Sequence, residues 1–145
     1  APRSLAWRYM TEPALRAAWT PGVERIDEAT AAGRRGAGTR NHCVHGKDAV
    51  LEEILDWRPF DYYTVERKAP MPLLRPTRTT YEFEDMPDGT TRLTEYSIPA
   101  PGFGQRLAFA VTNRMMASEM REAFASLRSA LAEAAGTTPT VESAP

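Results

Sequence analysis

The 145-residue sequence predicts an α+β fold, in which a curved antiparallel sheet wraps around one long C-terminal helix. The prediction rests on the order of three patterns. Two short helical patterns open the chain, hairpin-type strands follow one another through its middle, and one long helical pattern closes it. Because the helices are segregated at the ends, alternating β-α-β units are excluded and an antiparallel sheet is expected.

The first two helices are short and close together. The first helix is predicted from the apolar residues Leu5, Ala6, Trp7, Tyr9 and Met10. Thr11 followed by Pro13 is a pair that caps helices, and it predicts a second helix running to Trp19. The breaker Pro21-Gly22 then ends the second helix.

Six segments have the alternating or β-branched composition of strands. They cover residues 23–30, 39–45, 50–57, 62–68, 77–84 and 91–98. Glycines between residues 33 and 38 predict a hairpin turn, and Asp88-Gly89 predicts a tight turn between the last two strands. In the fifth segment Thr79, Tyr81 and Phe83 share one face, as a half-buried strand requires.

The closing helix is predicted over residues 103–134. Its apolar stripe, with spacings of three to five residues, comprises Leu107, Val111, Met116, Met120, Phe124, Leu127 and Leu131. Burying these side chains at about 1.5 to 3 kcal/mol each would hold the whole helix against the sheet. Residues 1–135 are therefore predicted to form one domain, and the small and polar residues 136–145 a flexible tail or linker.

Charge and composition exclude several classes of partner. The formal net charge is −1, so no basic field attracts nucleic acid or an anionic bilayer. No apolar run reaches the roughly 20 residues of a membrane span and no leader pattern opens the chain, so a soluble cytoplasmic protein is expected. The lone Cys43 excludes an internal disulfide and agrees with that compartment. A start at Ala1 also suggests a piece of a longer polypeptide.

The succession of elements resembles the START-like superfamily of helix-grip or SRPBCC proteins, which includes polyketide cyclase/dehydrase-like proteins, birch-pollen-type allergens and lipid-transfer domains. The resemblance is carried by residues 7–11 with Trp19, by the turn at residues 36–39, and by the paired strands before the final helix. It implies a helix-grip fold with an apolar cavity between sheet and helix. Such families place a strand before the two short helices, whereas only residues 1–3 precede them here. Six strands rather than seven are therefore expected, with one sheet edge open to pairing.

Two segments are similar, more narrowly, to a helix-grip domain found beside bacterial nucleotide-cyclase domains. They are residues 41–46 and 56–64. This resemblance implies a sensory or regulatory domain that is covalently linked to a neighbour such as a nucleotide cyclase. The sequence itself contains no catalytic segment of a nucleotide cyclase.

His42, Cys43 and His45 are the residues that could suggest a metal site, or a nucleophile with its base. On a strand, Cys43 and His45 share a face while His42 points away. Two ligands without a CxxC or HExxH partner do not make a zinc site, and alternate strand residues diverge from a common reacting atom. No metal, no other cofactor and no catalytic residue is therefore expected.

Charged side chains of the strands leave two interpretations open. Glu52, Glu53 or Asp56 would act as a general acid or base if buried in a pocket, although such carboxylates are more often solvated on the outer face. Adjacent Glu52 and Glu53 must face opposite sides of a strand. An inward arginine such as Arg78 or Arg92 would fix a ligand carboxylate, and an outward one would make a weak surface pair.

The predicted ligand-binding side chains combine apolar area with a few polar anchors, although core packing is the simpler role for each of them. They are Cys43, His45, Tyr63, Arg78, Tyr81, Tyr96, Met116 and Met120. The function expected first is noncatalytic binding of a lipid-like, aromatic or polyketide-like molecule. The alternatives are a polyketide cyclase or aromatase that uses His45, Arg78 and Tyr96, and a regulatory domain of a nucleotide cyclase.

Overall fold

The computed structural model describes residues 1–30, 33–70 and 74–136, and within these ranges it contains three helices and six strands. The helices are α1 (Arg3–Thr11), α2 (Pro13–Trp19) and α3 (Phe103–Gly136). The strands are β1 (Arg25–Ala29), β2 (Arg40–His45), β3 (Asp48–Arg58), β4 (Tyr62–Lys68), β5 (Thr77–Asp85) and β6 (Thr91–Ile98). The predicted α+β order is confirmed. Gly136 still belongs to α3, and the rest of the predicted tail, residues 137–145, lies outside the described residues.

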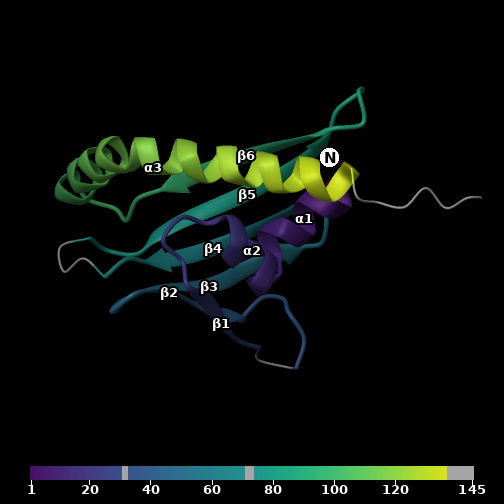
Figure 1. Cartoon of the computed structure of the whole chain (residues 1–145). Coiled ribbons are helices and arrows are strands. Elements are labelled where there is room, and N and C mark those ends of the chain that lie inside the picture. The colour runs from purple at the N-terminus through teal and green to yellow at the C-terminus, as the bar shows by residue number, and fades with distance from the viewer. Residues whose placement is uncertain (31–32, 71–73, 137–145) are drawn as a thin grey trace, which may run out of the picture.

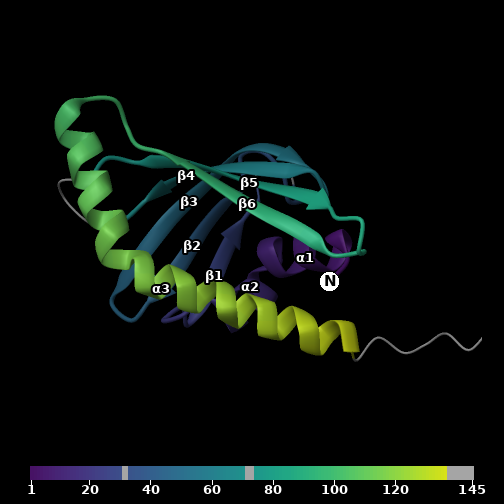
Figure 2. The same cartoon turned by 90° about the horizontal axis from the view of Figure 1, so that it is seen from above.

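All six strands form one antiparallel sheet in the order β1-β2-β3-β4-β5-β6, so each strand pairs with its neighbours in the sequence. Within the described residues, β1 and β6 are therefore the two edges. Figures 1 and 2 show the sheet curving, with all three helices on its concave side. The predicted helix-grip architecture with six strands is confirmed, and the concave side is called the inner face below.

A β-bulge interrupts the alternation of β3. The register with β4 shifts between Ile54 and Asp56, so Leu55 is the extra residue. Because the bulge takes up one position, Ile54 and Trp57 both contact the core although they are three residues apart. A bulge also increases the local twist of the strand pair, which helps the sheet to curve around the helices.

Side chains of β5 alternate as predicted. Thr79, Tyr81 and Phe83 are buried on the inner face, whereas Arg78 and Glu82 are exposed on the outer face. The outer face carries ion pairs between strands, and the inner face carries the apolar core. The two faces therefore differ in polarity as an antiparallel sheet covered on one side should.

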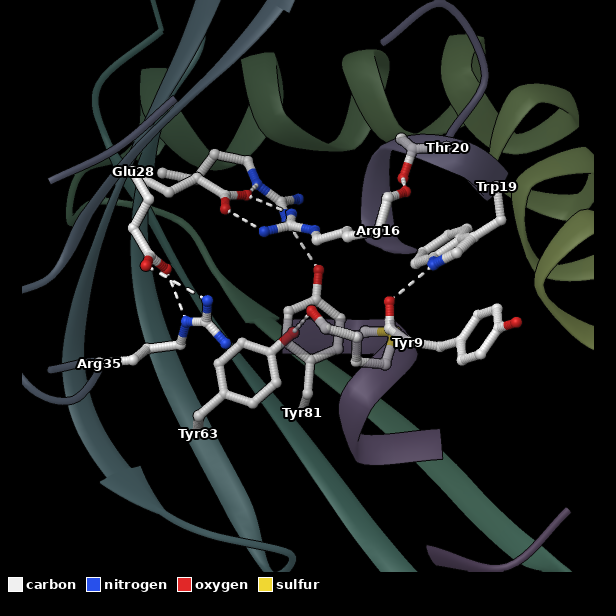
Figure 3. Close-up of polar contacts among 11 residues, drawn as sticks. Tyr9, Arg16, Trp19, Thr20, Glu28, Arg35, Tyr63 and Tyr81 are labelled. Atoms are coloured by element: carbon white, nitrogen blue, oxygen red, sulfur yellow. Dashed lines mark hydrogen bonds and ion pairs between the residues drawn. The ribbon is translucent and has the colours of Figure 1, made fainter. Parts of the chain in front are cut away.

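The corner between α1 and α2 differs from the prediction. Thr11 does not cap α2: it ends α1 and donates its hydroxyl to the Trp7 carbonyl at 2.8 Å, and Glu12 is the residue between the helices. The hydroxyl bonds back to the carbonyl four residues earlier, which is the common alternative for threonine within a helix. Trp19 Nε1 donates to the Tyr9 carbonyl at 2.8 Å and holds α2 against α1 (Figure 3).

The hydrophobic core lies between β3, β4 and β5, the two short helices, and the second half of α3. Its aromatic centre is Trp7, whose ring lies 4.8 Å from Trp57 and 5.2 Å from Phe83 between centroids. From α3, Ala123 and Leu127 are buried in the same cluster. One core therefore joins both ends of the described chain.

The first half of α3 is not packed in this way. Leu107 and Val111 are exposed, as are Phe103 and Met115, so the prediction that the whole stripe packs on the sheet is wrong. Leu107 and Val111 lie on the side of the helix opposite to Ala108, Phe109 and Thr112, which are partly buried. Figure 2 also shows that α3 bends, so that only its second half crosses α1 and α2, whereas its first half leaves the sheet at the end of β6. Within the described ranges, no helix has both the length and the apolar character of a membrane span.

Candidate functional site

A buried carboxylate held by two arginines lies on the inner face. Glu52 of β3 accepts hydrogen bonds from Arg16 Nη1 and Nη2, at 2.6 and 2.8 Å, and from Arg67 Nε at 2.9 Å. Arg67 Nη2 also donates to the Tyr81 hydroxyl at 2.6 Å. We call Arg16, Glu52, Arg67 and Tyr81 the inner cluster. Figure 3 shows Arg16 reaching from α2 over the sheet, toward Tyr63 and Tyr81.

The positive charges of Arg16 and Arg67 determine the protonation state of Glu52 in the inner cluster. The Glu52 side chain is 1% exposed. Burial alone would raise its pKa, but the guanidinium groups of Arg16 and Arg67 outweigh burial and hold the pKa of Glu52 well below its usual range. Glu52 is therefore an ionised carboxylate at neutral pH and cannot act as a general acid. Two guanidinium ions and one carboxylate leave the inner cluster with one net positive charge.

The register of the sheet explains why these residues meet. Glu52 pairs directly with Arg67 across β3 and β4, and side chains of paired residues lie on the same face. Glu53, one residue on, faces outward and pairs with Arg40 at 3.0 Å. The expectation that Glu52 and Glu53 face opposite sides is confirmed, and Glu52 is the inward one.

Tyr63 and Tyr81 point inward, as expected for ligand-binding candidates. Their rings stack with centroids 5.0 Å apart, and Tyr63 also packs edge-on against Trp7 at 5.7 Å. The Tyr63 hydroxyl donates to the Met10 carbonyl at 3.4 Å. Burial raises the pKa of both tyrosines, so they stay protonated. Tyr63 belongs to the aromatic core, whereas Tyr81 extends its hydroxyl to Arg67 in the inner cluster.

Of the candidates on β2, Cys43 lies near this cluster and is affected by the charges of Glu52, Arg16 and Arg67. Cys43 is buried and His45 is partly buried, whereas His42 is exposed, so the predicted alternation is confirmed. Burial, assisted by the charge of Glu52, raises the pKa of the Cys43 thiol to about 11, which leaves it protonated and weakly nucleophilic. Asn41 Oδ1 is buried and has no hydrogen-bond donor among the described residues. The part of the chain that the structure describes contains no group of three His, Cys, Asp or Glu side chains that could hold a metal.

Met116 and Met120 lie where the packed and unpacked halves of α3 meet. Met120 is partly buried, one turn before Phe124, which packs against the core. Met116 is 42% exposed, and its neighbour Met115 is 75% exposed. Met116 is one helical turn from Met120 and shares its side of α3, and Met115 is the most exposed of the three.

Arg78 and Tyr96 are not part of this region, and the expectation that they point inward is wrong. Arg78 lies on the outer face, where its Nε is 3.4 Å from a Glu66 carboxylate oxygen. Tyr96 is exposed and pairs with Thr80, also outside. The physical reason is that successive side chains of a strand point to opposite faces of the sheet. Tyr81 points to the inner face, so Arg78, three residues earlier on β5, points to the outer face, and so does Tyr96, which pairs with Thr80.

Two residues of the inner cluster, Arg16 and Arg67, were not among the predicted site residues. A signal for Arg67 is present in the sequence, because it is in phase with Tyr63 and Val65 on the fourth strand and therefore shares their inner face. No comparable pattern marks Arg16, whose partner comes from a strand 36 residues later.

Two surface depressions lie outside this region. The larger, of about 630 Å³, is lined mainly by charged side chains, among them Arg3, Glu82, Glu84, Asp85 and Arg92. The other, of about 510 Å³, lies between α2 and β1 and is lined by Pro13, Ala14, Ala17, Ala18, Glu24, Arg25 and Ile26. The charged wall of the first is a poor match for an apolar ligand.

Comparison with solved structures agrees with this fold. A protein from Mesorhizobium loti is 19% identical, with a TM-score of 0.70 over 91% of this chain and 90% of that chain. A protein from Rhodobacter sphaeroides is 20% identical, with a TM-score of 0.67 over 92% and 87%. The protein Ara h 8.0201 is 15% identical, with a TM-score of 0.57 over 88% and 91%. At these identities the likeness concerns the fold alone.

Sequence comparison identifies the family. No curated protein matches the sequence. The family model described as polyketide cyclase / dehydrase and lipid transport matches residues 1–132, which is nearly the whole described chain and includes all six strands and most of α3. The predicted resemblance is thereby confirmed, and the chain belongs to the polyketide cyclase / dehydrase and lipid transport family.

Proposed function

We propose that the chain binds an apolar small molecule between the inner face of the sheet and the first half of α3, without catalysing a reaction on it. The observation that carries this proposal is the loosely packed first half of α3, where Ala108, Phe109 and Thr112 are partly buried but belong to no core cluster. Phe103, Leu107 and Val111 add exposed apolar surface on the other side of the same turns. Apolar surface of this kind is a common feature of ligand and interaction sites. The family description, which includes lipid transport, points in the same direction.

The protonation states of the inward groups favour binding over catalysis. Glu52 is an ionised carboxylate already engaged by two arginines, and Cys43 is a buried neutral thiol. Neither is suited to act as a general acid, a general base or a nucleophile. The cyclase alternative relied on His45, Arg78 and Tyr96, of which the last two lie on the outer face.

Thermal unfolding with a panel of lipid-like, aromatic and polyketide-like compounds tests the proposal. A ligand present at one hundred times its dissociation constant stabilises the native state by about 2.7 kcal/mol. For a domain of this size that corresponds to a rise in Tm of roughly 5 to 10 °C. A panel in which no compound raises the Tm, at concentrations up to its solubility, would contradict the proposal.

Two adjacent methionines locate the site. Met116→Trp places a large ring on the side of α3 that carries the partly buried Met120. It is expected to weaken binding of the best compound at least about tenfold, since overfilling displaces the ligand. Met115→Trp adds the same ring at the more exposed position and is expected to leave the affinity unchanged. Equal affinities of the two variants would place the ligand elsewhere.

A covalently linked nucleotide-cyclase domain and a cytoplasmic location remain predictions of the sequence. The full reading frame tests the first, because a catalytic cyclase domain encoded next to this domain would support a sensory role. Apolar ligand binding is compatible with such a role, since a ligand that stabilises one conformation can shift a linked domain.

A further inference from the structure

The inner cluster has an unbalanced charge. Arg16 and Arg67 share one carboxylate, Glu52. Two other carboxylates in the described inner face have different partners: Glu28 is bound by Arg35 at 2.6 Å, and Glu95 accepts a hydrogen bond from Ser97. One positive charge inside the fold is therefore left without a directly paired anion, and a partly buried charge is costly unless it is paired.

Arg16 Nε and Arg67 Nη1 both lack an acceptor among the described residues, and Arg67 is the more exposed of the two arginines. Its Nε and Nη2 are occupied by Glu52 and the Tyr81 hydroxyl, whereas no acceptor for Nη1 is found among the described residues. The Arg67 side chain is 25% exposed, twice the 12% of Arg16, so Arg67 is the more accessible of the two. A guanidinium that is already fixed by two hydrogen bonds loses little freedom when it binds a further anion.

The position of Arg67 relates it to the proposed ligand site. Arg67 pairs with Thr77 at the start of β5, and the next residue, Arg78, pairs with Ile98 at the end of β6. This is the end of the sheet from which the chain enters α3. The Arg75 amide also donates to Gln105 Oε1 at 2.9 Å, which ties the loop before β5 to the first turns of α3. Arg67 and the first half of α3 therefore lie at the same end of the fold.

The opposite end is closed. The rings of Trp7, Trp57, Tyr63 and Phe83 pack there with centroid separations of 4.8 to 6.3 Å. An apolar molecule along the first half of α3 thus has a fixed cation on its inner side and aromatic packing beyond it. An acidic group is the chemical feature that this arrangement would select.

Resting on the proposed function, we propose that the ligand of this chain is an apolar acid, whose carboxylate pairs with the free edge of Arg67 in the inner cluster. The carboxylate completes the charge balance of two arginines and two carboxylates. Charge-assisted hydrogen bonds to a preorganised guanidinium predict that an apolar acid binds about ten to one hundred times more tightly than the matching neutral alcohol.

Matched pairs of ligands test this inference by titration calorimetry at pH 7.5. Suitable pairs are dodecanoic acid with dodecanol, and naphthoic acid with naphthalenemethanol. Acid preference in the wild-type chain supports the inference. Equal binding of acid and alcohol overturns it while the proposed function stands, whereas failure of every compound in both pairs and in the wider panel overturns the proposed function itself.

Two arginine variants then assign the preference to Arg67. Arg67→Met keeps Glu52 paired with Arg16 and is expected to remove the acid preference while alcohol binding is retained. The control Arg78→Met removes an arginine from the neighbouring strand on the outer face and is expected to change neither affinity. If Arg67→Met does not fold, Arg67→Lys serves instead, because a point charge without the planar fork should lower the preference several-fold. An unchanged preference in the folded Arg67 variant overturns the assignment.

Discussion

Removal of the charge on Glu52 is the most direct test of the inner cluster. In Glu52→Gln, three charge-assisted hydrogen bonds lose their ionised acceptor, and each such bond contributes about 1.5 to 3 kcal/mol. The amide oxygen of glutamine still accepts part of them, and both arginines keep some contact with solvent, so the sum is an upper limit. We expect a loss of about 3 to 5 kcal/mol, as when a buried ion pair is left with an uncompensated charge.

Urea unfolding at pH 7 measures this loss, and the next residue supplies the control. Glu53→Gln makes the same chemical change on the outer face, where both side chains of the Glu53–Arg40 ion pair are exposed to solvent. An exposed pair contributes about 0 to 1 kcal/mol, so the control should unfold almost like the wild type. The comparison separates the effect of burial from the effect of the substitution.

Acidification adds a second test with a defined sign. The pKa of Glu52 is well below its usual range in the folded state and near 4.3 when unfolded. Its contribution is therefore complete above about pH 5 and is lost progressively as the pH falls further. The stability difference between wild type and Glu52→Gln should narrow below pH 5. A loss under about 1 kcal/mol at pH 7, or a difference that does not change with pH, would refute the role given to the cluster.

Two further outcomes follow from burial. Cys43, buried and with a pKa of about 11, should react with a thiol reagent at pH 8 at least a hundredfold more slowly in the native chain than in urea, and fast native labelling would contradict its position. Leu127→Ala should lower the unfolding free energy by about 2 to 5 kcal/mol, whereas Leu107→Ala should change it by less than about 0.5 kcal/mol. Equal losses in urea unfolding would show that both halves of α3 are packed.

The fold could be predicted from the sequence because its signals are local. Alternation in the strands, the turn at Asp88-Gly89 and the breaker before Phe103 each act over a few residues, and all of them agree with the structure. The capping of α2 was predicted wrongly because a threonine near a helix end can satisfy a carbonyl behind it as readily as an amide ahead.

The site was harder to predict because it depends on which face of each strand is covered. Alternation correctly placed Tyr81 and Arg78 on opposite faces of β5, and Tyr96 on the face of β6 opposite to Glu95 and Ser97. It does not say which of the two faces of the sheet the helices cover. For β6 the polar Glu95 and Ser97 face inward while Tyr96 and Ile98 face outward, the reverse of a simple apolar-inside rule. The inner face of β6 can be assigned only from the pairing of its residues with the buried residues of β5.

The extra residue in β3 lets this strand lose one residue at the bulge without turning its later side chains to the other face of the sheet. Elsewhere in a strand, loss of one residue would exchange inside and outside for every side chain beyond it. At Leu55 the same loss would restore simple alternation, with Ile54 and Trp57 still directed to the interior. Homologues can therefore differ by one residue at this point and keep the same interior, changing only how strongly the sheet is bent.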